Sequence, residues 1–356
     1  MKINFVLNSV LDAHSLKRVN DFKEFGFDVK VYGFVREQEA NIHTDATVIG
    51  KFSNALSYRK RIKIYFHGIN NLFKREKDEN VIWYYLGLDV AMFAVLLRRK
   101  QKFIYEECDL VQTYIANKSL SRALESMDKL IIRKSLLTLM TSSGFLQYHY
   151  KDYHPHNIMI VPNKLSPKIK EYPAPRLHSP DSHHLRFAFV GGVRYASLLS
   201  IAQLITSNFP NHEFHFYGFI SPTLQTVNLP KADNIFYHGR FNSPEDLNGI
   251  YSNIDILVCT YDTDEENVKY AEPNKLYEAL YFNCPIIVSK GTFLSKRVQE
   301  LNIGYDVDAY QEEDVKTMVK HIEKDVYNKV NYISSMDKSS SIDDDSYLRK
   351  IDNYIK

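Results

Sequence analysis

A glutamate near the start of a predicted helix is the most informative feature of the sequence. The stretch EPNKLYE covers residues 272–278. Pro273 suits the first turn of a helix, where its missing N–H is not needed. The backbone donors of Asn274 and Lys275, together with the helix dipole, then favour an anion such as a diphosphate. Glu278 lies one turn further on and can accept hydrogen bonds from the two hydroxyls of a ribose. The alternative is an ordinary amphipathic surface helix.

A glycine pair and an arginine follow a predicted strand in the second half of the chain. The apolar run FAFV ends at Val190 and is followed by Gly191 and Gly192. Glycines let a backbone approach a ligand closely, although such a pair is often only a turn. Arg194 would offer a planar guanidinium to a phosphate, including one that gains charge as it leaves.

The sequence does not indicate a metal or a disulfide. The acidic loop TYDTDEEN at 260–267 lacks EF-hand spacing, and a solvated loop is the favoured interpretation. Cys108, Cys259 and Cys284 form neither a CxxC pair nor a Cys/His cluster. We therefore expect no metal, no required cofactor and a reducing compartment.

These residues must be positioned by elements that alternate along the chain. Short apolar runs alternate with amphipathic stretches in both halves, which is typical of parallel βαβ units. We expect strands at 3–7, 29–32, 81–86, 103–105, 136–141, 158–161, 186–190, 213–217, 235–238, 254–259 and 285–288, with helices at 15–25, 198–208, 274–282 and 347–355. Five prolines between Pro162 and Ser182 interrupt the pattern, which then starts again.

The interruption divides the chain into two α/β domains. We expect a first domain at 1–163, a proline-rich linker at 164–184 and a second domain at 185–330. Residues 331–356 form a polar segment and a final helix that is expected to pack back on the first domain. A length of 356 residues suits two domains of this size.

Composition and charge exclude several classes of protein. Charged residues make up 25% of the chain, and the formal net charge is only +2. A nucleic-acid protein would need a clear basic excess, so we expect no nucleic-acid partner. The apolar run at 86–97 is too short to span a bilayer and contains Asp89, and the N-terminus lacks the features of a signal peptide. We expect a cytoplasmic protein.

The sequence PNKLYEAL, followed by CPIIVS, resembles the donor-site helix of retaining glycosyltransferases of the GT-B fold, family 4. The resemblance implies an α/β fold of two Rossmann-like domains facing across a cleft, the second of which holds a nucleotide sugar. It implies that Glu278 binds the ribose and that the helix start faces the diphosphate. The full set of implied donor-binding residues is Gly191, Gly192, Arg194, Gly218, Arg240, Phe241, Asn274, Lys275, Leu276 and Glu278.

The same resemblance indicates catalytic and acceptor residues. The implied catalytic residues are Arg194, Glu272 and His14. The family has a glutamate where this chain has Tyr270, so either Glu272 or the backbone of the loop takes that place. Many members also carry a lysine where Leu199 stands, and Lys275 or another base is a possible substitute.

Two carboxylates after the predicted strand at 103–105 are the acceptor-side candidates. Glu107 and Asp109 belong to the stretch IYEECDL, which resembles the family's strand end. They would orient an acceptor hydroxyl, and capping of the following helix explains them equally well. His14 is likewise either functional or structural.

The expected reaction is sugar transfer with retention from a UDP- or GDP-sugar to a saccharide or polyprenyl-linked acceptor, in surface polysaccharide biosynthesis such as capsule assembly. The basic segments 57–75 and 98–100 are either a peripheral contact with the cytoplasmic face of the inner membrane or a solvated helix surface. Two alternatives stay open: a GT-B-fold epimerase or phosphorylase, and a non-catalytic nucleotide-sugar-binding subunit.

Overall fold

The computed structural model describes residues 1–36, 45–53, 56, 58–98, 100–175, 179–221, 224 and 229–356. The side chains of Tyr58 and Arg59 are outside this description, as are Ser57 and Arg99 of the two basic segments and residues 176–178 of the predicted linker. The chain forms two compact units. The first contains residues 1–162 and 344–356, and the second contains residues 163–343.

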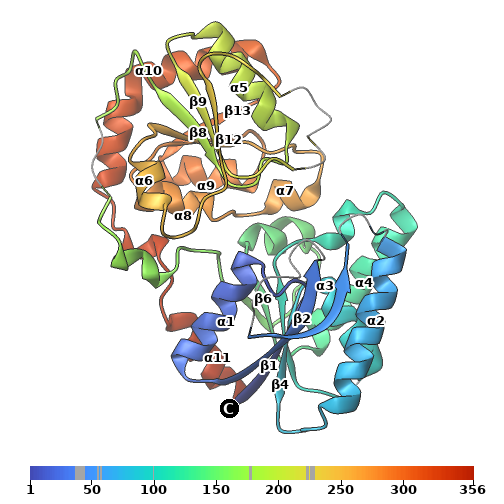
Figure 1. Ribbon diagram of the computed structural model, residues 1–356. Helices are drawn as coiled ribbons and strands as arrows, with labels where there is room; N and C mark the ends of the chain where they lie inside the picture. Colours follow the sequence, from blue (N-terminus) through green and yellow to red (C-terminus); the bar gives the residue numbers. More distant parts are fainter. Residues whose placement is uncertain are drawn as a thin grey trace. The chain divides into compact units, whose positions relative to one another are not determined.

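The first unit is built on a seven-stranded parallel sheet in the order β3-β2-β1-β4-β5-β6-β7 (Figure 1). Its strands are β1 (Lys2–Leu7), β2 (Asp28–Arg36), β3 (Thr47–Phe52), β4 (Ile82–Leu86), β5 (Phe103–Glu107), β6 (Leu137–Met140) and β7 (Ile158–Ile160). Its helices are α1 (Ala13–Phe25), α2 (Tyr58–Arg75), α3 (Leu88–Leu97), α4 (Lys118–Lys134) and α11 (Ser346–Ile355), with short turns η2 (Val111–Tyr114) and η3 (Phe145–His149).

The second unit repeats this design with six parallel strands in the order β10-β9-β8-β11-β12-β13. Its strands are β8 (Arg186–Val190), β9 (Glu213–Tyr217), β10 (Ile235–Gly239), β11 (Ile256–Cys259), β12 (Ile286–Ser289) and β13 (Gly304–Val307). Its helices are α5 (Ala196–Asn208), α6 (Leu247–Tyr251), α7 (Glu266–Tyr270), α8 (Lys275–Tyr281), α9 (Phe293–Leu301) and α10 (Glu312–Ser334), with turns η4 (Pro167–Glu171) and η5 (Ser339–Ser341). Two parallel-sheet α/β domains therefore confirm the expected fold class.

The second sheet is buried on both faces, as parallel strands require. One face packs against α6, α8 and α9, with Val190, Leu257 and Val288 at its centre. The other packs against α5 and α10 through Phe189 and Val258. In each sheet the strand order reverses at one point, between β1 and β4 or between β8 and β11. Ligands of such sheets bind at this point, beyond the carboxyl ends of the strands.

The structure adds detail at the unit boundaries. Leu165 and Ile169, within the segment expected to be a linker, are buried in the core of the second unit. The final helix α11 belongs to the first unit, where Leu348 and Ile351 join the core beside α1 and β1.

Strands β3 and β13 had no counterpart among the expected elements. β13 reads GYDV, which offers little apolar periodicity.

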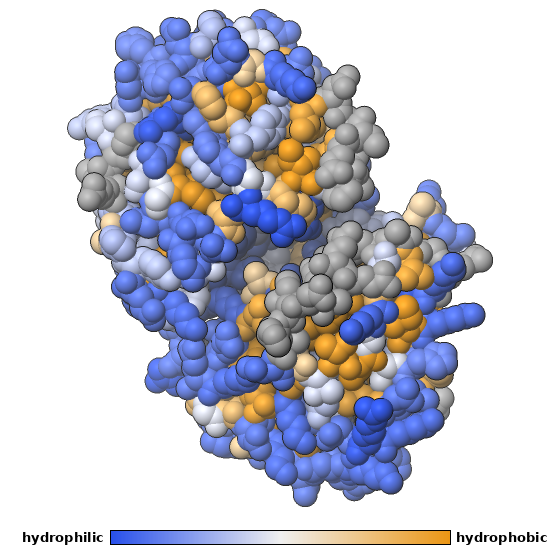
Figure 2. All heavy atoms as spheres, in the orientation of Figure 1, coloured by the Kyte–Doolittle hydropathy of each residue, from blue (hydrophilic) through white to orange (hydrophobic). Residues whose placement is uncertain are grey.

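Hydrophilic residues cover much of the visible surface of each unit (Figure 2). The described part of the chain contains no helix long and apolar enough to cross a membrane. Helix α2 buries Tyr65, Ile69 and Leu72 and exposes Lys63 and Phe66 on its other side.

Candidate functional site

Three glycine turns lie side by side at the carboxyl ends of β8, β9 and β10. Gly191, Gly218 and Gly239 have φ angles of 147°, 136° and 78°, a region that favours glycine. The N–H of Gly191 donates to Tyr217 O at 2.7 Å, and the N–H of Gly218 donates to Gly239 O at 2.6 Å. A Cβ on Gly218 would lie 1.8 Å from Gly191 O. The backbones therefore pack directly on one another at these strand ends.

Two arginines flank one aromatic ring beside these turns. The guanidinium carbons of Arg194 and Arg240 lie 5.7 Å and 5.4 Å from the ring centroid of Phe219. We call Arg194 and Arg240 the arginine pair. They follow different strands, β8 and β10, yet both contact the same ring, which is 38% exposed. This positive region at the strand ends suits an anionic ligand.

Glu278 is held by four hydrogen bonds within the described structure. Lys275 Nζ donates to both carboxylate oxygens at 2.7 Å, and Asn274 Nδ2 donates to Oε1 at 2.7 Å. The hydroxyl of Tyr251 donates to Oε2 at 2.5 Å. Glu278 is only 2% exposed, so its negative charge is balanced inside the unit rather than by water.

Lys275 links this carboxylate to the glycine turns. A Cβ placed on Gly191 would lie 3.7 Å from Lys275 Cε, so the lysine stem passes beside that turn. The amides of Leu276 and Glu278 already donate to the carbonyls of Pro273 and Asn274, so these two amides are occupied within the helix. The Lys275 ammonium, in contrast, lies near both the glycine turns and Glu278.

The remaining predicted residues of this unit lie around the same edge. Phe241 packs against the core cluster on the α6, α8 and α9 face. Glu272 is 7% exposed, and its carboxylate accepts hydrogen bonds from the Tyr277 hydroxyl and, at 3.1 Å, from Arg297 Nε. Glu272 thereby connects the loop before α8 to α9, and its catalytic role stays a prediction.

In the first unit, His14 lies against a buried ion pair. His14 Nε2 is 2.8 Å from Glu106 Oε1, and Arg18 Nη2 donates to the same oxygen at 2.9 Å. The Tyr84 hydroxyl donates to the other oxygen. Burial alone would raise the pKa of Glu106, but the charges and hydrogen bonds of Arg18 and His14 outweigh it and lower that pKa.

Glu107 and Asp109, the predicted acceptor-side residues, have different surroundings. Glu107 is 1% exposed and accepts a hydrogen bond from the Tyr150 hydroxyl at 2.7 Å. Burial and the neighbouring Asp128 raise the pKa of Glu107 well above its ordinary value. Asp109 is exposed in the turn that precedes η2. Of these two carboxylates, Asp109 is the one that solvent or a ligand reaches.

One group of described residues has the composition of a metal site. The possible ligand atoms of His14, Glu106 and Cys108 lie within 4.8 Å of one another. Arg18 already binds the carboxylate of this group, and its positive charge opposes a cation there. The residues fit a metal poorly for that reason.

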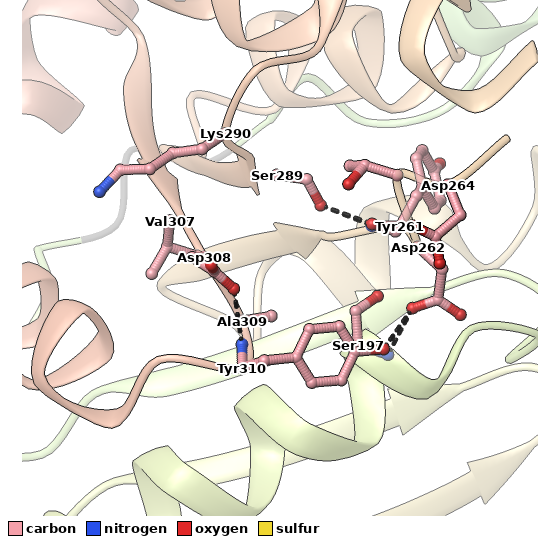
Figure 3. Close-up of a pocket in the computed structure, with 11 residues that line it drawn as sticks. Ser197, Tyr261, Asp262, Asp264, Ser289, Lys290, Val307, Asp308, Ala309 and Tyr310 are labelled. Carbon is pink, nitrogen blue, oxygen red and sulfur yellow. Dashed lines mark hydrogen bonds between the residues drawn. The ribbon is translucent and has the colours of Figure 1, made fainter. Parts of the chain in front are cut away.

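A separate pocket lies at the carboxyl ends of β11, β12 and β13 (Figure 3). It has a volume of about 490 Å³. We call it the acidic pocket because Asp262, Asp264 and Asp308 line it. Ser197, Lys290 and Tyr310 also belong to its lining. Neither the arginine pair nor Lys275 nor Glu278 lines it.

Sequence reasoning missed several residues of the site. Phe219 was not singled out, although it directly follows Gly218. Tyr251, Arg18 and Glu106 were also missed, because their partners are far away in the sequence. For Glu106, one signal was available in the sequence. Neighbouring strand residues point to opposite faces of a sheet, so the Glu106-Glu107 pair at a strand end places a carboxylate on each face.

Comparisons with known proteins agree on the fold. The sequence matches no family model, and no curated protein sequence is significantly similar to it. Among solved structures, HepE of Anabaena in complex with UDP-glucose is similar with a TM-score of 0.72 and 12% identity, over 100% of this chain and 99% of that one. Sucrose-phosphate synthase of Thermosynechococcus elongatus has a TM-score of 0.66 and 13% identity over 94% of each chain. A UDP-N-acetylglucosamine 2-epimerase has a TM-score of 0.59 and 13% identity, over 99% and 94%. The chain therefore has the two-domain GT-B fold.

Proposed function

We propose that this protein is a glycosyltransferase that takes a sugar from a nucleotide-sugar donor held by its second unit. The observation that carries the proposal is the meeting of the glycine turns, the arginine pair and the Lys275–Glu278 ion pair at one end of the sheet. In this proposal the cations balance the charge of a diphosphate beside the glycine turns, and the Glu278 carboxylate binds the ribose.

When the donor binds, the hydrogen-bond partners of the Glu278 carboxylate change. In the structure Lys275 donates to both oxygens of this carboxylate. Two ribose hydroxyls can replace those hydrogen bonds, and the ammonium can turn to the diphosphate beside Gly191. Each charged group keeps a partner throughout, so the exchange avoids leaving an unpaired buried charge.

The arginine pair supports the chemical step. When the glycosidic bond breaks, negative charge grows on the leaving diphosphate, and a preorganised guanidinium stabilises it. Arg194, Glu272 and His14 are the proposed catalytic residues. Transfer with retention, and a role in surface polysaccharide biosynthesis, follow from the resemblance of residues 272–289. We propose a saccharide or polyprenyl-linked acceptor and no required cofactor.

UDP is the first nucleotide to test, because HepE, a protein with this fold, was solved with UDP and with UDP-glucose. The purified protein would be incubated with UDP-glucose, UDP-galactose and UDP-N-acetylglucosamine, with and without a panel of saccharides. We expect UDP release that a saccharide accelerates, and a product whose anomeric configuration matches the donor by NMR. Arg194→Ala should slow the reaction by about 100-fold. Absence of UDP release with every donor would contradict the proposal.

An epimerase is the second candidate, because a UDP-N-acetylglucosamine 2-epimerase shares the fold. It predicts that UDP-N-acetylglucosamine changes configuration at C2 without any saccharide acceptor. The same NMR experiment detects this product, so the two candidates give different spectra.

A further inference from the structure

The acidic pocket is a preformed cavity on the second unit. Its volume of about 490 Å³ falls within the range of small-molecule sites. It lies at the carboxyl end of the sheet, where α5 begins and β11, β12 and β13 end (Figure 3). The residues proposed to hold the diphosphate and the ribose of the donor do not line it.

Hydrogen bonds between the loops fix the walls of the pocket. Asp262 accepts from the amides of Ala196 and Ser197 at 3.0 Å and 2.9 Å, and from the Tyr310 hydroxyl at 2.6 Å. The Ser289 hydroxyl accepts from Tyr261 N and donates to Tyr261 O, both at 2.8 Å. Three strand ends are thus tied to one another and to α5, so a ligand would meet a preorganised site.

Some polar groups of the pocket are not used by the fold. Ser197 is 1% exposed, and its Oγ has no hydrogen-bond partner among the described residues. Such an orphaned buried hydroxyl is costly unless something binds it. Asp264 and Asp308 are exposed at the edge of the pocket and add two carboxylates, although Asp308 Oδ1 also accepts a hydrogen bond from the Tyr310 amide at 3.0 Å.

The chemistry of the lining narrows the ligand class. Asp262, Asp264 and Asp308 outnumber the single cation Lys290, which is itself paired with Asp314 at 2.5 Å, so an anion is disfavoured. Asp262 already accepts three hydrogen bonds, which leaves it poorly suited to a metal ion. Tyr310 is 56% exposed and offers an aromatic face beside the carboxylates.

A neutral sugar ring matches these features. Its hydroxyls can donate to the carboxylates and accept from Ser197, while its C–H face packs on the aromatic ring of Tyr310. We propose that the acidic pocket binds a neutral pyranose. This ring is either the sugar of the nucleotide donor or a separate saccharide, and the chemistry of recognition is the same.

The test is a titration of the full-length, isotope-labelled protein with glucose, galactose and N-acetylglucosamine, followed by the backbone amide signals of Tyr261, Asp308 and Tyr310. At least one sugar should shift these signals saturably. Tyr310→Ala should weaken that binding about fivefold or more, whereas Tyr310→Phe keeps the ring and should retain most of it. Tyr327→Ala, on the exposed side of α10, is the matched control.

Titrations with UDP-glucose and UDP identify the source of the sugar. Shifts at the pocket with UDP-glucose but not with UDP would assign it to the donor's sugar, and shifts with free sugar alone would assign a separate saccharide. No saturable shift with any of the free sugars or with UDP-glucose, equal binding by Tyr310→Ala, or tighter binding of the diamine putrescine would overturn the inference. Because free sugars need no nucleotide site, a failed donor proposal would be seen separately.

Discussion

Lys275 and Glu278 form the ion pair on which the proposed donor site depends. Both side chains are buried, and each oxygen of Glu278 receives hydrogen bonds from two groups. A buried charge that loses its partner is strongly destabilising. The pair therefore contributes to the stability of α8 and also belongs to the proposed ligand site.

Lys275→Met should lower the free energy of unfolding by about 3 kcal/mol, because the Glu278 carboxylate would stay buried with only Tyr251 and Asn274 as partners. Urea denaturation measures this. Lys316→Met removes a surface lysine paired with Glu312 and Glu313, and it should change stability far less, because solvent screens those ion pairs. Equal effects of the two substitutions would contradict the role given to Lys275.

The lowered pKa of Glu106 predicts that the stability of the first unit depends on pH. Its pKa is lowered in the folded state from an ordinary value of 4.5, so the unfolded state binds more protons below that pH. The stability that Glu106 provides is fully present above about pH 5 and is lost as the pH falls towards the folded pKa.

Glu106→Gln should therefore destabilise the protein most at neutral pH. The difference in the free energy of unfolding between this variant and wild type should shrink by about 1.4 kcal/mol per pH unit below pH 4. Urea denaturation at pH 7, 4 and 3.5 follows this difference. A difference that does not change with pH would show that the Glu106 charge is not stabilised in the fold.

At the scale of elements, the ends of β8, β9 and β10 build the site through their backbones. The turns at Gly191, Gly218 and Gly239 bring the arginine pair to a single ring although 46 positions separate the two arginines in the numbering, from 194 to 240. Close backbone approach leaves no room for a side chain at the middle turn.

Gly218→Ala should lower the free energy of unfolding by about 3 kcal/mol or more, because its φ is 136° and a methyl group would overlap Gly191 O. Gly249→Ala is the matched control, since Gly249 lies in α6 and nothing lies within 4 Å of an added Cβ. Alanine should stabilise that helix by about 0.5–1 kcal/mol. Similar stability of the two variants would refute the packing of the glycine turns.

The elements also show what sequence patterns can and cannot reveal. Parallel βαβ units were predictable because apolar runs of strand length recur between amphipathic helices, as at 186–190 and 198–208. β13 was missed because four residues, one of them Asp306, give too little pattern. Glu278 and Arg194 were singled out from local motifs, and their roles stay predictions. Phe219, Tyr251 and Glu106 were not, because tertiary contacts rather than neighbouring residues define their roles.

At the scale of the whole molecule, the chain returns to its first unit at the end. The boundary lies between Asp343 and Asp344, and α11 then packs on the first core. The ring of Tyr347 lies 4.8 Å from the guanidinium carbon of Arg18, and its hydroxyl donates to Asp21 at 2.7 Å. The C-terminal helix thus supports the ion pair that holds His14.

Deletion of residues 344–356 should destabilise the first unit by about 5 kcal/mol, because it exposes the sites covered by Tyr347, Leu348 and Ile351. Differential scanning calorimetry should show an earlier transition for that unit and little change in the other. Tyr354→Ala, at a position 51% exposed in the same helix, is the control and should change neither transition. An unchanged first transition in the deletion variant would contradict the role of α11.

Binding of a nucleotide sugar by the second unit is the central claim, and calorimetric titration with UDP-glucose tests it most directly. The compared proteins are wild type, Glu278→Gln and the surface control Glu313→Gln, whose side chain is 86% exposed. We predict saturable one-to-one binding that Glu278→Gln weakens about tenfold or more and Glu313→Gln leaves unchanged. Equal binding by all three proteins, or no binding by wild type to UDP-glucose, would contradict the account.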